Sequence, residues 1–415
     1  MRIAITANGP GEFAGWVRPL VAALRARDPS VELHVLSVPD DFASGREAAY
    51  AAELFPGLRA YPPSAYLRLA LGRSVEGLPA RVDRVQYLGG DLAHAARVHA
   101  RLGGTLTTYK FSRKRYAGEV ARVFAVDDAN VAQLERWGTP RERIDVVGNL
   151  AIDGALGEAS GAYGGDAGDD CAAGGIVIFP GSRKHEVANL FPFFLRVALE
   201  LRRRLPGVPI AFAGSPFVAD GTVRAALAAG PAHPLIYGER GDLRDGAIVA
   251  RGERFPLVRA GMRAASRARL AISIPGTKLV ELGALGVPAV VCMMLNAPEL
   301  IVVPGVVQYV GKLPLIGAPL KRAAVVYGTA RFGRVAQPNI DAGHEIEPEL
   351  FGTLLPSHVA RVAAERWSDA AWCASAGAEL RALYAAHAGA ADRMARALLE
   401  KAAAPPAAAP KAAVR

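Results

Sequence analysis

The sequence has few cysteines and few aromatic residues. Its three cysteines, Cys171, Cys292 and Cys373, are scattered over 415 residues, without the short spacings of zinc ligands or of a disulfide framework. This pattern predicts a protein of a reducing cytoplasm. Aromatic residues make up only 7%, and no helix-turn-helix, zinc-finger or RNA-binding signature is present, so nucleic acid is not an expected partner.

Long apolar segments are also missing. The amino terminus reaches Gly9 and Pro10 after one short apolar run, and it lacks the basic region and long apolar stretch of a signal peptide. The closest approach to a membrane span, Leu300–Leu320, is interrupted by prolines and glycines. The sequence therefore predicts a cytoplasmic protein that is at most peripheral at the inner face of the cytoplasmic membrane.

Positive charge is in excess, with a formal net charge of +10. A basic surface favours acidic partners such as phosphorylated metabolites or an anionic membrane face. Lys110, Arg113, Lys114 and Arg115, together with Leu300–Leu320, are candidates for such a membrane contact. The alternative is a solvated basic loop and an ordinary core segment.

Short apolar, β-branched segments alternate with helical patterns in both halves of the chain. The alternation predicts an α/β fold of two doubly wound, Rossmann-like domains facing a central cleft. The predicted parts are a first domain at 1–153, a Gly-, Ala- and Asp-rich linker at 154–175, a second domain at 176–365, C-terminal helices at 366–401 that pack back on the first domain, and a disordered tail at 402–415.

A candidate phosphate site opens the second half. The strand predicted at Ile176–Phe179 leads through Gly181, Ser182 and Arg183 into a helix from Glu186. Backbone N–H groups at a helix start attract anions, and an arginine can bind two phosphate oxygens at once. The alternative is a plain turn in which Ser182 caps the helix, with Glu186 downstream.

A second strand–turn–helix segment is predicted at Gly276 and Thr277, which join another strand to a helix. This helix start can point at the same phosphates. Glu281 lies one helical turn farther on the same face, where its carboxylate can bind a ribose diol. The alternative is a capped helix with a solvated glutamate.

In the first half, Asp91 follows the strand predicted at Val85–Leu88. A carboxylate there faces the cleft and can act as a general base toward an acceptor hydroxyl, with His94 near enough to orient it. The alternative is that Asp91 caps the following helix. Asp127 and Asp128 are predicted to cap a helix rather than to bind a metal, and neither a metal nor a cofactor is expected.

The first strand is followed by a glycine-rich loop that contains Gly11, Glu12 and Gly15. The loop does not have the dinucleotide-binding fingerprint, and no acidic residue closes the second strand. It is either an ordinary loop or one that lets an acceptor approach the backbone closely.

Together these segments resemble lipid A disaccharide synthases, bacterial glycosyltransferases of the GT-B fold, in order over most of the chain. The matching segments are Gly11–Gly15, Asp91, Val147–Asp153, Pro180–Glu186, Gly276–Pro288 and Pro338–Leu350. The last segment is the most specific, because no general rule of folding brings its residues together.

That family joins a UDP-linked, acylated glucosamine to an acylated glucosamine phosphate, and it releases UDP with inversion and without a metal. The resemblance implies a UDP-sugar donor, a lipid-linked acceptor and peripheral membrane contact. The implied donor-site residues are Gly181, Ser182, Arg183, Gly276, Thr277, Glu281, Asn339 and Glu345; the implied acceptor-site residues are Gly11, Glu12 and Gly15; the implied base is Asp91.

Departures from the family pattern lie on the acceptor side. Trp16 stands where the family has an aspartate, Asn149 replaces its histidine, and Tyr109–Tyr116 replaces its Trp-rich stretch. Two other functions remain open. A UDP-sugar 2-epimerase would have the same fold but would need a cluster of catalytic acids and histidines, which the sequence does not assemble. A non-catalytic homologue would bind sugar nucleotides without turnover.

Overall fold

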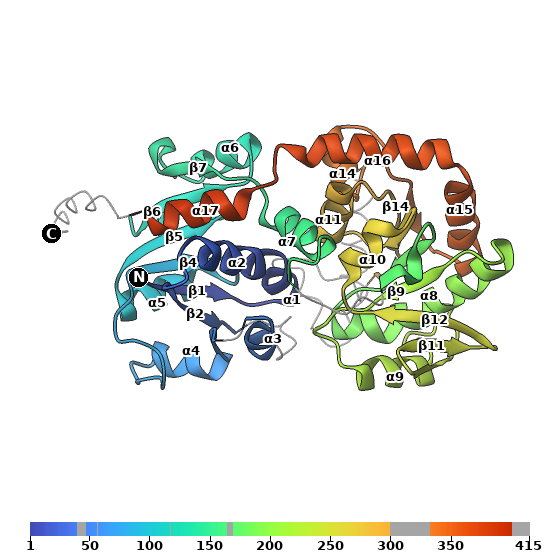
Figure 1. The fold of residues 1–415 in the computed structure, drawn as a ribbon, viewed down its shortest axis with the longest axis horizontal. Coiled ribbons are helices and arrows are strands. Elements are labelled where there is room, and N and C mark those ends of the chain that lie inside the picture. The colour runs from blue at the N-terminus through green and yellow to red at the C-terminus, as the bar shows by residue number, and fades with distance from the viewer. Residues whose placement is uncertain (40–46, 56, 117, 164–168, 299–332, 401–415) are drawn as a thin grey trace. The chain divides into compact units, whose positions relative to one another are not determined.

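The computed structural model describes residues 1–39, 47–55, 57–116, 118–163, 169–298 and 333–400 (Figure 1). The chain forms two compact units. The first unit contains Met1–Asp153 and the chain from His387 onward, and the second contains Gly154–Ala386. The apolar run Leu300–Leu320 and the tail from residue 402 lie outside the described residues.

The first unit is built on a parallel sheet with the strand order β3-β2-β1-β4-β5-β6-β7. Its strands are β1 (Arg2–Ala7), β2 (Glu32–Ser37), β3 (Arg59–Tyr61), β4 (Arg84–Tyr87), β5 (Thr105–Tyr109), β6 (Val120–Ala125) and β7 (Ile144–Val146). Its helices are α1 (Pro10–Glu12), which continues through a π-helical turn at Phe13–Val17 into α2 (Arg18–Arg27), then α3 (Glu47–Leu54), α4 (Pro63–Ala70), α5 (Leu92–Leu102), α6 (Asp128–Arg136) and α17 (Ala390–Leu399). Helix α7 (Leu150–Ala159) begins in this unit and continues beyond Asp153 into the second. Short 3-10 turns lie at Lys114–Tyr116 and Arg141–Arg143.

The second unit is built on a sheet with the order β10-β11-β12-β9-β8-β13-β14-β15, in which β10 and β11 form an antiparallel extension. Its strands are β8 (Ile176–Phe179), β9 (Ile210–Ala213), β10 (Asp242–Arg244), β11 (Ala247–Ala250), β12 (Glu253–Val258), β13 (Leu270–Ser273), β14 (Ala289–Met294) and β15 (Glu349–Gly352). Its helices are α8 (Lys184–Arg204), α9 (Asp220–Ala229), α10 (Gly261–Arg267), α11 (Thr277–Leu285), α14 (Gln337–Ala342), α15 (Pro356–Ser368) and α16 (Ala370–Ala385), with a 3-10 turn at Asp169–Ala172.

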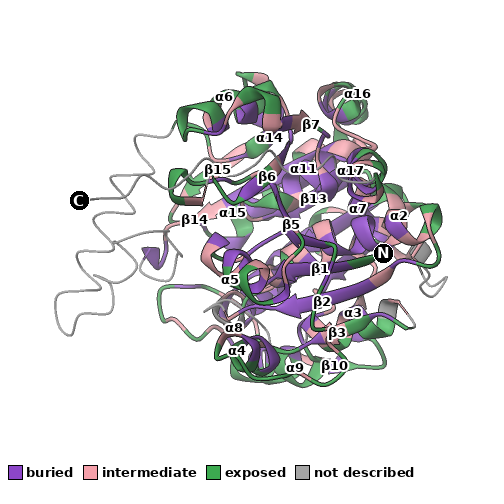
Figure 2. Cartoon of the chain, turned by 90° about the vertical axis from the view of Figure 1, so that its left-hand side faces the viewer, coloured by how far each residue is buried: buried purple, intermediate pink, exposed green. Residues whose placement is uncertain are grey.

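Parallel strands covered by helices on both faces are buried throughout, which explains why these strands are apolar runs in the sequence. In β1, every residue after Arg2 is buried, and Figure 2 shows β1 and β2 in the colour of buried residues. The strands predicted at Arg2–Ala7, Thr105–Tyr109 and Ile176–Phe179 are confirmed to the residue. The predicted α/β class with two doubly wound sheets is confirmed as well.

The structure differs in part from two expectations about the chain outside the sheets, although one C-terminal helix, α17, does pack on the first unit. Residues 154–159 are not linker but the second half of α7, in which Ala155 is buried. This half of the helix consists mostly of glycine and alanine, so the sequence shows no apolar periodicity there. The C-terminal helices also do not form one group: α16 packs on α11 within the second unit, whereas α17 packs on α2 within the first.

The return of the chain to the first unit is fixed by Asp153. Its carboxylate accepts hydrogen bonds from the N–H groups of Gly389 at 2.7 Å and Ala391 at 2.6 Å, which satisfies orphan donors at the start of α17. Gly148 adopts φ +95°, and a Cβ there would lie 2.4 Å from the carbonyl oxygen of His387. The segment Val147–Asp153 thus anchors the last described helix.

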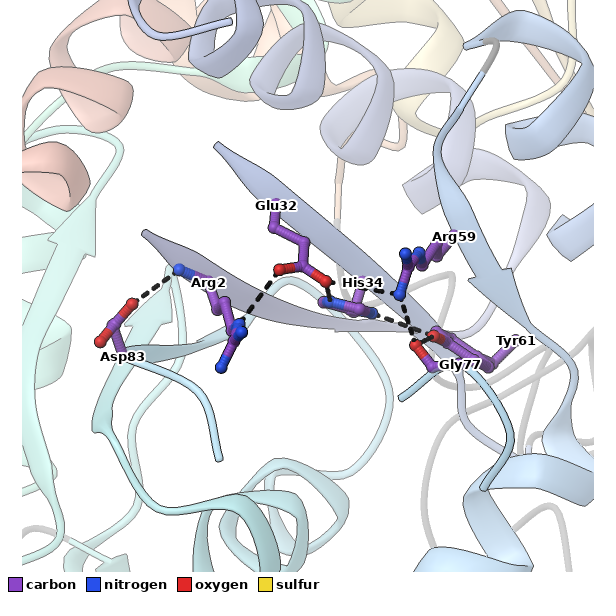
Figure 3. Close-up of polar contacts among 7 residues, drawn as sticks. All are labelled: Arg2, Glu32, His34, Arg59, Tyr61, Gly77 and Asp83. Atoms are coloured by element: carbon purple, nitrogen blue, oxygen red, sulfur yellow. Dashed lines mark hydrogen bonds and ion pairs between the residues drawn. The ribbon is translucent and has the colours of Figure 1, made fainter. Parts of the chain in front are cut away.

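A separate polar network joins β1, β2 and β3 (Figure 3). His34 is fully buried, with Nδ1 3.0 Å from the Tyr61 hydroxyl and Nε2 3.2 Å from a Glu32 oxygen. Glu32 also accepts a hydrogen bond from Arg2 at 3.0 Å. Burial lowers the pKa of His34, while the neighbouring Glu32 carboxylate opposes this shift. None of the candidate site residues belongs to this network.

Candidate functional site

Most of the candidate residues lie at the points where the strand order of each sheet reverses, whereas Asn339 and Glu345 lie between β14 and β15. In the first sheet, β1 and β4 are neighbours and their connections leave in opposite directions; in the second, β8 and β13 are the corresponding pair. Ligands of doubly wound folds bind outside the carboxyl ends of the strands at such switch points. Glu12 and Asp91 follow the first pair of strands, and Arg183 and Thr277 follow the second.

The Gly181–Arg183 loop already holds an anion, the side chain of Glu186. Glu186 Oε2 accepts hydrogen bonds from the N–H groups of Ser182 at 2.8 Å and Arg183 at 2.9 Å. Its Oε1 accepts from the Arg183 guanidinium at 3.0 Å. The alternative of a capped turn is therefore what the structure shows, with Glu186 rather than Ser182 as the capping side chain. Glu186 lies three residues after Arg183, the spacing of the glutamate in a capping box. This spacing could have indicated from the sequence that Glu186 caps the helix.

The second loop, at the start of α11, is different. Gly276 adopts φ +153°, and among the described residues no side chain caps the helix and no atom lies within 4 Å of a Cβ built on Gly276. Thr277 is exposed beside it. Lys278 Nζ donates to Glu281 Oε2 at 2.5 Å, and Glu281 is 4% exposed. Glu281 is thus neither solvated nor free, and Lys278, which the sequence did not single out, is its partner.

The predicted role of Asn339 in lining the donor site is not supported by its surroundings. Asn339 is fully buried and donates hydrogen bonds to the Glu347 carbonyl and to Glu349 Oε1, both at 2.8 Å. Its Oδ1 accepts from the N–H groups of Ile346 at 2.8 Å and Glu347 at 2.9 Å. Glu345, in contrast, is exposed. The amide of Asn339 is saturated by the protein itself.

Two glutamates of the same segment stand out only in the structure. Glu349 accepts hydrogen bonds from the N–H groups of Val335 at 2.8 Å and Ala336 at 3.0 Å, ahead of α14. Glu347 is fully buried and accepts from the Ala289 N–H at 3.0 Å, and its other oxygen, Oε2, has no hydrogen-bond partner among the residues that the structure describes. Burial raises the pKa of Glu347 to about 8. The most specific segment of the sequence therefore holds β14, β15 and α14 together.

In the first unit, the loop after β1 repeats the arrangement seen at Glu186. Glu12 Oε2 accepts hydrogen bonds from the N–H groups of Asn8 at 3.0 Å and Gly9 at 3.2 Å. Gly89, at the end of β4, lies against this carboxylate, because a Cβ there would fall within 1.9 Å of Glu12 Oε2. Gly15 is buried, so it cannot contact an acceptor directly.

Asp91 is the N-cap of α5, the alternative that the sequence left open. Its Oδ1 accepts from the Ala93 N–H at 2.9 Å, and its Oδ2 lies 3.7 Å from an Arg113 nitrogen. The side chain remains 49% exposed, so a substrate hydroxyl can still reach it. His94 Nδ1 lies 2.6 Å from the Tyr66 hydroxyl, a contact that the sequence did not indicate.

Tyr87 is a further residue of this cluster that the sequence did not indicate. It is 4% exposed and donates from its hydroxyl to the Gly90 carbonyl at 2.8 Å. Burial, and after it the Glu12 and Asp91 carboxylates, raise its pKa well above the ordinary value. Tyr87 therefore stays neutral and fixes the loop that carries Asp91.

Comparison of the sequence with protein families and with curated proteins found no match. Comparison of the fold with solved structures found Staphylococcus aureus MnaA in a structure with UDP, at 14% identity and a TM-score of 0.57, with 96% of this chain and 95% of that chain covered. A UDP-N-acetylglucosamine 2-epimerase matches at 13% identity and a TM-score of 0.53, covering 95% and 94%. Anabaena HepE, in complex with UDP-glucose, matches at 11% identity and a TM-score of 0.50, covering 96% and 99%.

These similarities span nearly the full length of both chains and include both Rossmann-like sheets. The chain therefore has the two-domain GT-B fold. At these identities the similarity establishes the architecture, and the chemistry has to be argued from the site. No helix among the described residues is both long and apolar enough to cross a bilayer.

Proposed function

We propose that the protein is an inverting glycosyltransferase that uses a UDP-activated, acylated glucosamine donor and a glycolipid acceptor, as in the lipid A disaccharide synthase family that its sequence resembles. The observation that carries the proposal is the position of the matching residues. Of these residues, Glu12 and Asp91 follow β1 and β4 in one unit, and Arg183 and Thr277 follow β8 and β13 in the other. These are the strand ends where such folds bind ligands.

The donor would bind in the second unit. The uncapped start of α11 offers backbone N–H groups and the dipole of a helix to the diphosphate. Arg183 adds a guanidinium that is 47% exposed in its side chain, and Lys278 adds a second positive charge beside Thr277. These groups would stabilise the negative charge that develops on UDP as it leaves, which is the electrostatic part of catalysis.

The acceptor would bind in the first unit, with Asp91 as the base. Asp91 would take the proton of the acceptor hydroxyl while the oxygen attacks the anomeric carbon and UDP departs with the bonding electrons. The backbone hydrogen bond to Oδ1 fixes the carboxylate, and the half-exposed side chain would receive the hydroxyl proton at Oδ2, which lies 3.7 Å from an Arg113 nitrogen. Gly11 and Glu12 are proposed to border this acceptor site.

An exposed patch beside Asp91 suits a lipid-linked acceptor at an anionic membrane. Arg113, Lys114 and Arg115 are all exposed. Phe111 and Trp137 stack with ring centroids 6.4 Å apart, and they are 39% and 37% exposed. Basic side chains next to exposed aromatic rings favour the interface of an anionic bilayer.

The test is UDP release from a panel of UDP-sugars, with and without acylated glucosamine phosphate. We expect release that depends on both donor and acceptor. Asp91→Asn should bind UDP as the wild type does and lose turnover by about 10²- to 10⁴-fold, the usual range for a general base. Turnover that is unchanged in Asp91→Asn would remove Asp91 from the mechanism, and UDP binding without release under any condition would favour the non-catalytic homologue.

A UDP-sugar 2-epimerase is the second candidate, favoured by the fold similarity to one such enzyme. Glu12 and Asp91 also bring two carboxylates to the same switch point around Tyr87. An epimerase needs no acceptor. Incubation of the protein with UDP-N-acetylglucosamine alone, followed by proton NMR, would show a second epimer if this candidate is correct and an unchanged spectrum if the transferase proposal is correct.

A further inference from the structure

We propose that Glu186 is an internal competitor for the donor diphosphate, and that a UDP-sugar must displace its carboxylate before it can bind the Gly181–Arg183 loop. The inference rests on the proposed function, because it assumes that a nucleotide diphosphate is the ligand of the second unit. It assigns to Glu186 an effect on donor affinity that neither the sequence pattern nor the fold indicates.

The contacts of Glu186 are those expected of a bound anion. One carboxylate takes three donors, two backbone N–H groups at 2.8 and 2.9 Å and the Arg183 guanidinium at 3.0 Å. Its side chain is only 11% exposed. Gly181 makes this possible: it adopts φ +92°, and a Cβ there would lie 2.6 Å from Glu186 Oε2. The loop is shaped around the carboxylate.

Carboxylate and phosphate oxygens compete for the same donors. Both accept charge-assisted hydrogen bonds from backbone N–H groups at a helix start and from a guanidinium. The three donors that the sequence assigns to phosphate are the three that Glu186 occupies. A diphosphate carries more negative charge than one carboxylate, so it can take these donors, but each contact with Glu186 must first be broken.

The other loop of the second unit provides the contrast. At the start of α11 no side chain of the described residues caps the helix, and none of their atoms lies within 4 Å of a Cβ built on Gly276. A diphosphate can contact the backbone N–H groups at Thr277 without displacing a capping carboxylate, although Lys278 Nζ is already paired with Glu281. The free-energy cost of displacing a capping carboxylate therefore arises at the Gly181–Arg183 loop. This cost should become smaller when Glu186 is replaced by an uncharged residue.

The experiment measures UDP binding by isothermal titration calorimetry to wild-type protein, Glu186→Gln and a control, Asp127→Asn. Asp127 caps α6 in the first unit by accepting from the Asn130 N–H at 2.7 Å, so its variant also loses a carboxylate cap but at no candidate site. We expect the dissociation constant for UDP to fall about tenfold in Glu186→Gln, the equivalent of one lost cap interaction. It should stay unchanged in Asp127→Asn.

A tighter complex is a result that a purely structural role for Glu186 would not give, since loss of a structural cap would weaken binding. An equal or weaker affinity in Glu186→Gln, with normal binding by the wild type, would overturn this inference and leave the proposed function standing. Failure of every variant and of the wild type to bind UDP would overturn both. If Glu186→Gln does not fold, Glu186→Asp, whose carboxylate reaches less far, is expected to bind UDP more tightly than the wild type and is judged by the same outcomes.

Discussion

Replacing Asn339 with alanine is expected to destabilise the second unit. The side-chain amide uses both of its hydrogens and both lone pairs of its oxygen within the protein. Alanine removes all four hydrogen bonds and leaves the buried N–H groups of Ile346 and Glu347 without these partners. A buried group left unpaired costs about 1 to 3 kcal/mol, so the free energy of unfolding should fall by about 3 to 5 kcal/mol.

Urea unfolding followed by circular dichroism measures this loss, and UDP titration of the folded variant measures any effect on binding. The matched control is Gln337→Ala on the same helix, because Gln337 is exposed and bonds only another exposed side chain among its observed contacts, Asp341 at 2.7 Å. Its expected effect is within about 0.5 kcal/mol. A loss below about 1 kcal/mol in Asn339→Ala, combined with a large loss of UDP affinity, would refute the structural role and restore Asn339 to the donor site.

Three further outcomes follow from single groups. The pKa of Glu347 is raised from 4.5 to about 8. Its protonated carboxyl therefore contributes its full stabilisation below pH 4.5, and this stabilisation is lost as the pH rises toward 8. The free energy of unfolding should fall by at most about 1.4 kcal/mol per pH unit. Glu347→Gln should remove this pH dependence of the free energy of unfolding, measured by urea unfolding at pH 6 to 9. An unchanged pH dependence in the variant would show that Glu347 is not its source. The pKa of His34 is lowered from 6.5, so its neutral form stabilises the first unit above that pH, and thermal unfolding should show a loss on acidification that His34→Gln lacks. Asp153→Ala should cost about 1 to 2 kcal/mol and expose α17 to limited proteolysis, whereas equal digestion of variant and wild type would show that Asp153 does not hold the helix.

The local structure of both sheets could be predicted because it depends on neighbouring residues. Buried parallel strands are apolar on both faces, so Arg2–Ala7 and Ile176–Phe179 stand out as short apolar runs, each with a glycine two residues after its end. The cap at Asp127 was also predictable and is confirmed, since the side chain accepts from a backbone N–H three residues later. Alanine-rich α7 was missed because small residues on every face leave no periodic signal.

The residue types that follow the strands can be read from the amino-acid sequence, and they predict anion-binding and carboxylate groups at the two switch points. The hydrogen-bond partner of each group depends on the three-dimensional fold. Ser182, Arg183 and Glu186 permit either an open phosphate loop or a loop closed by its own glutamate, and the choice depends on where the Glu186 carboxylate lies over Gly181. In the same way, Asn339 is occupied by a segment brought to it by β14 and β15. A polar group forms hydrogen bonds with the groups that the fold brings within hydrogen-bonding distance. Distances between residues far apart in the chain cannot be read from the sequence pattern.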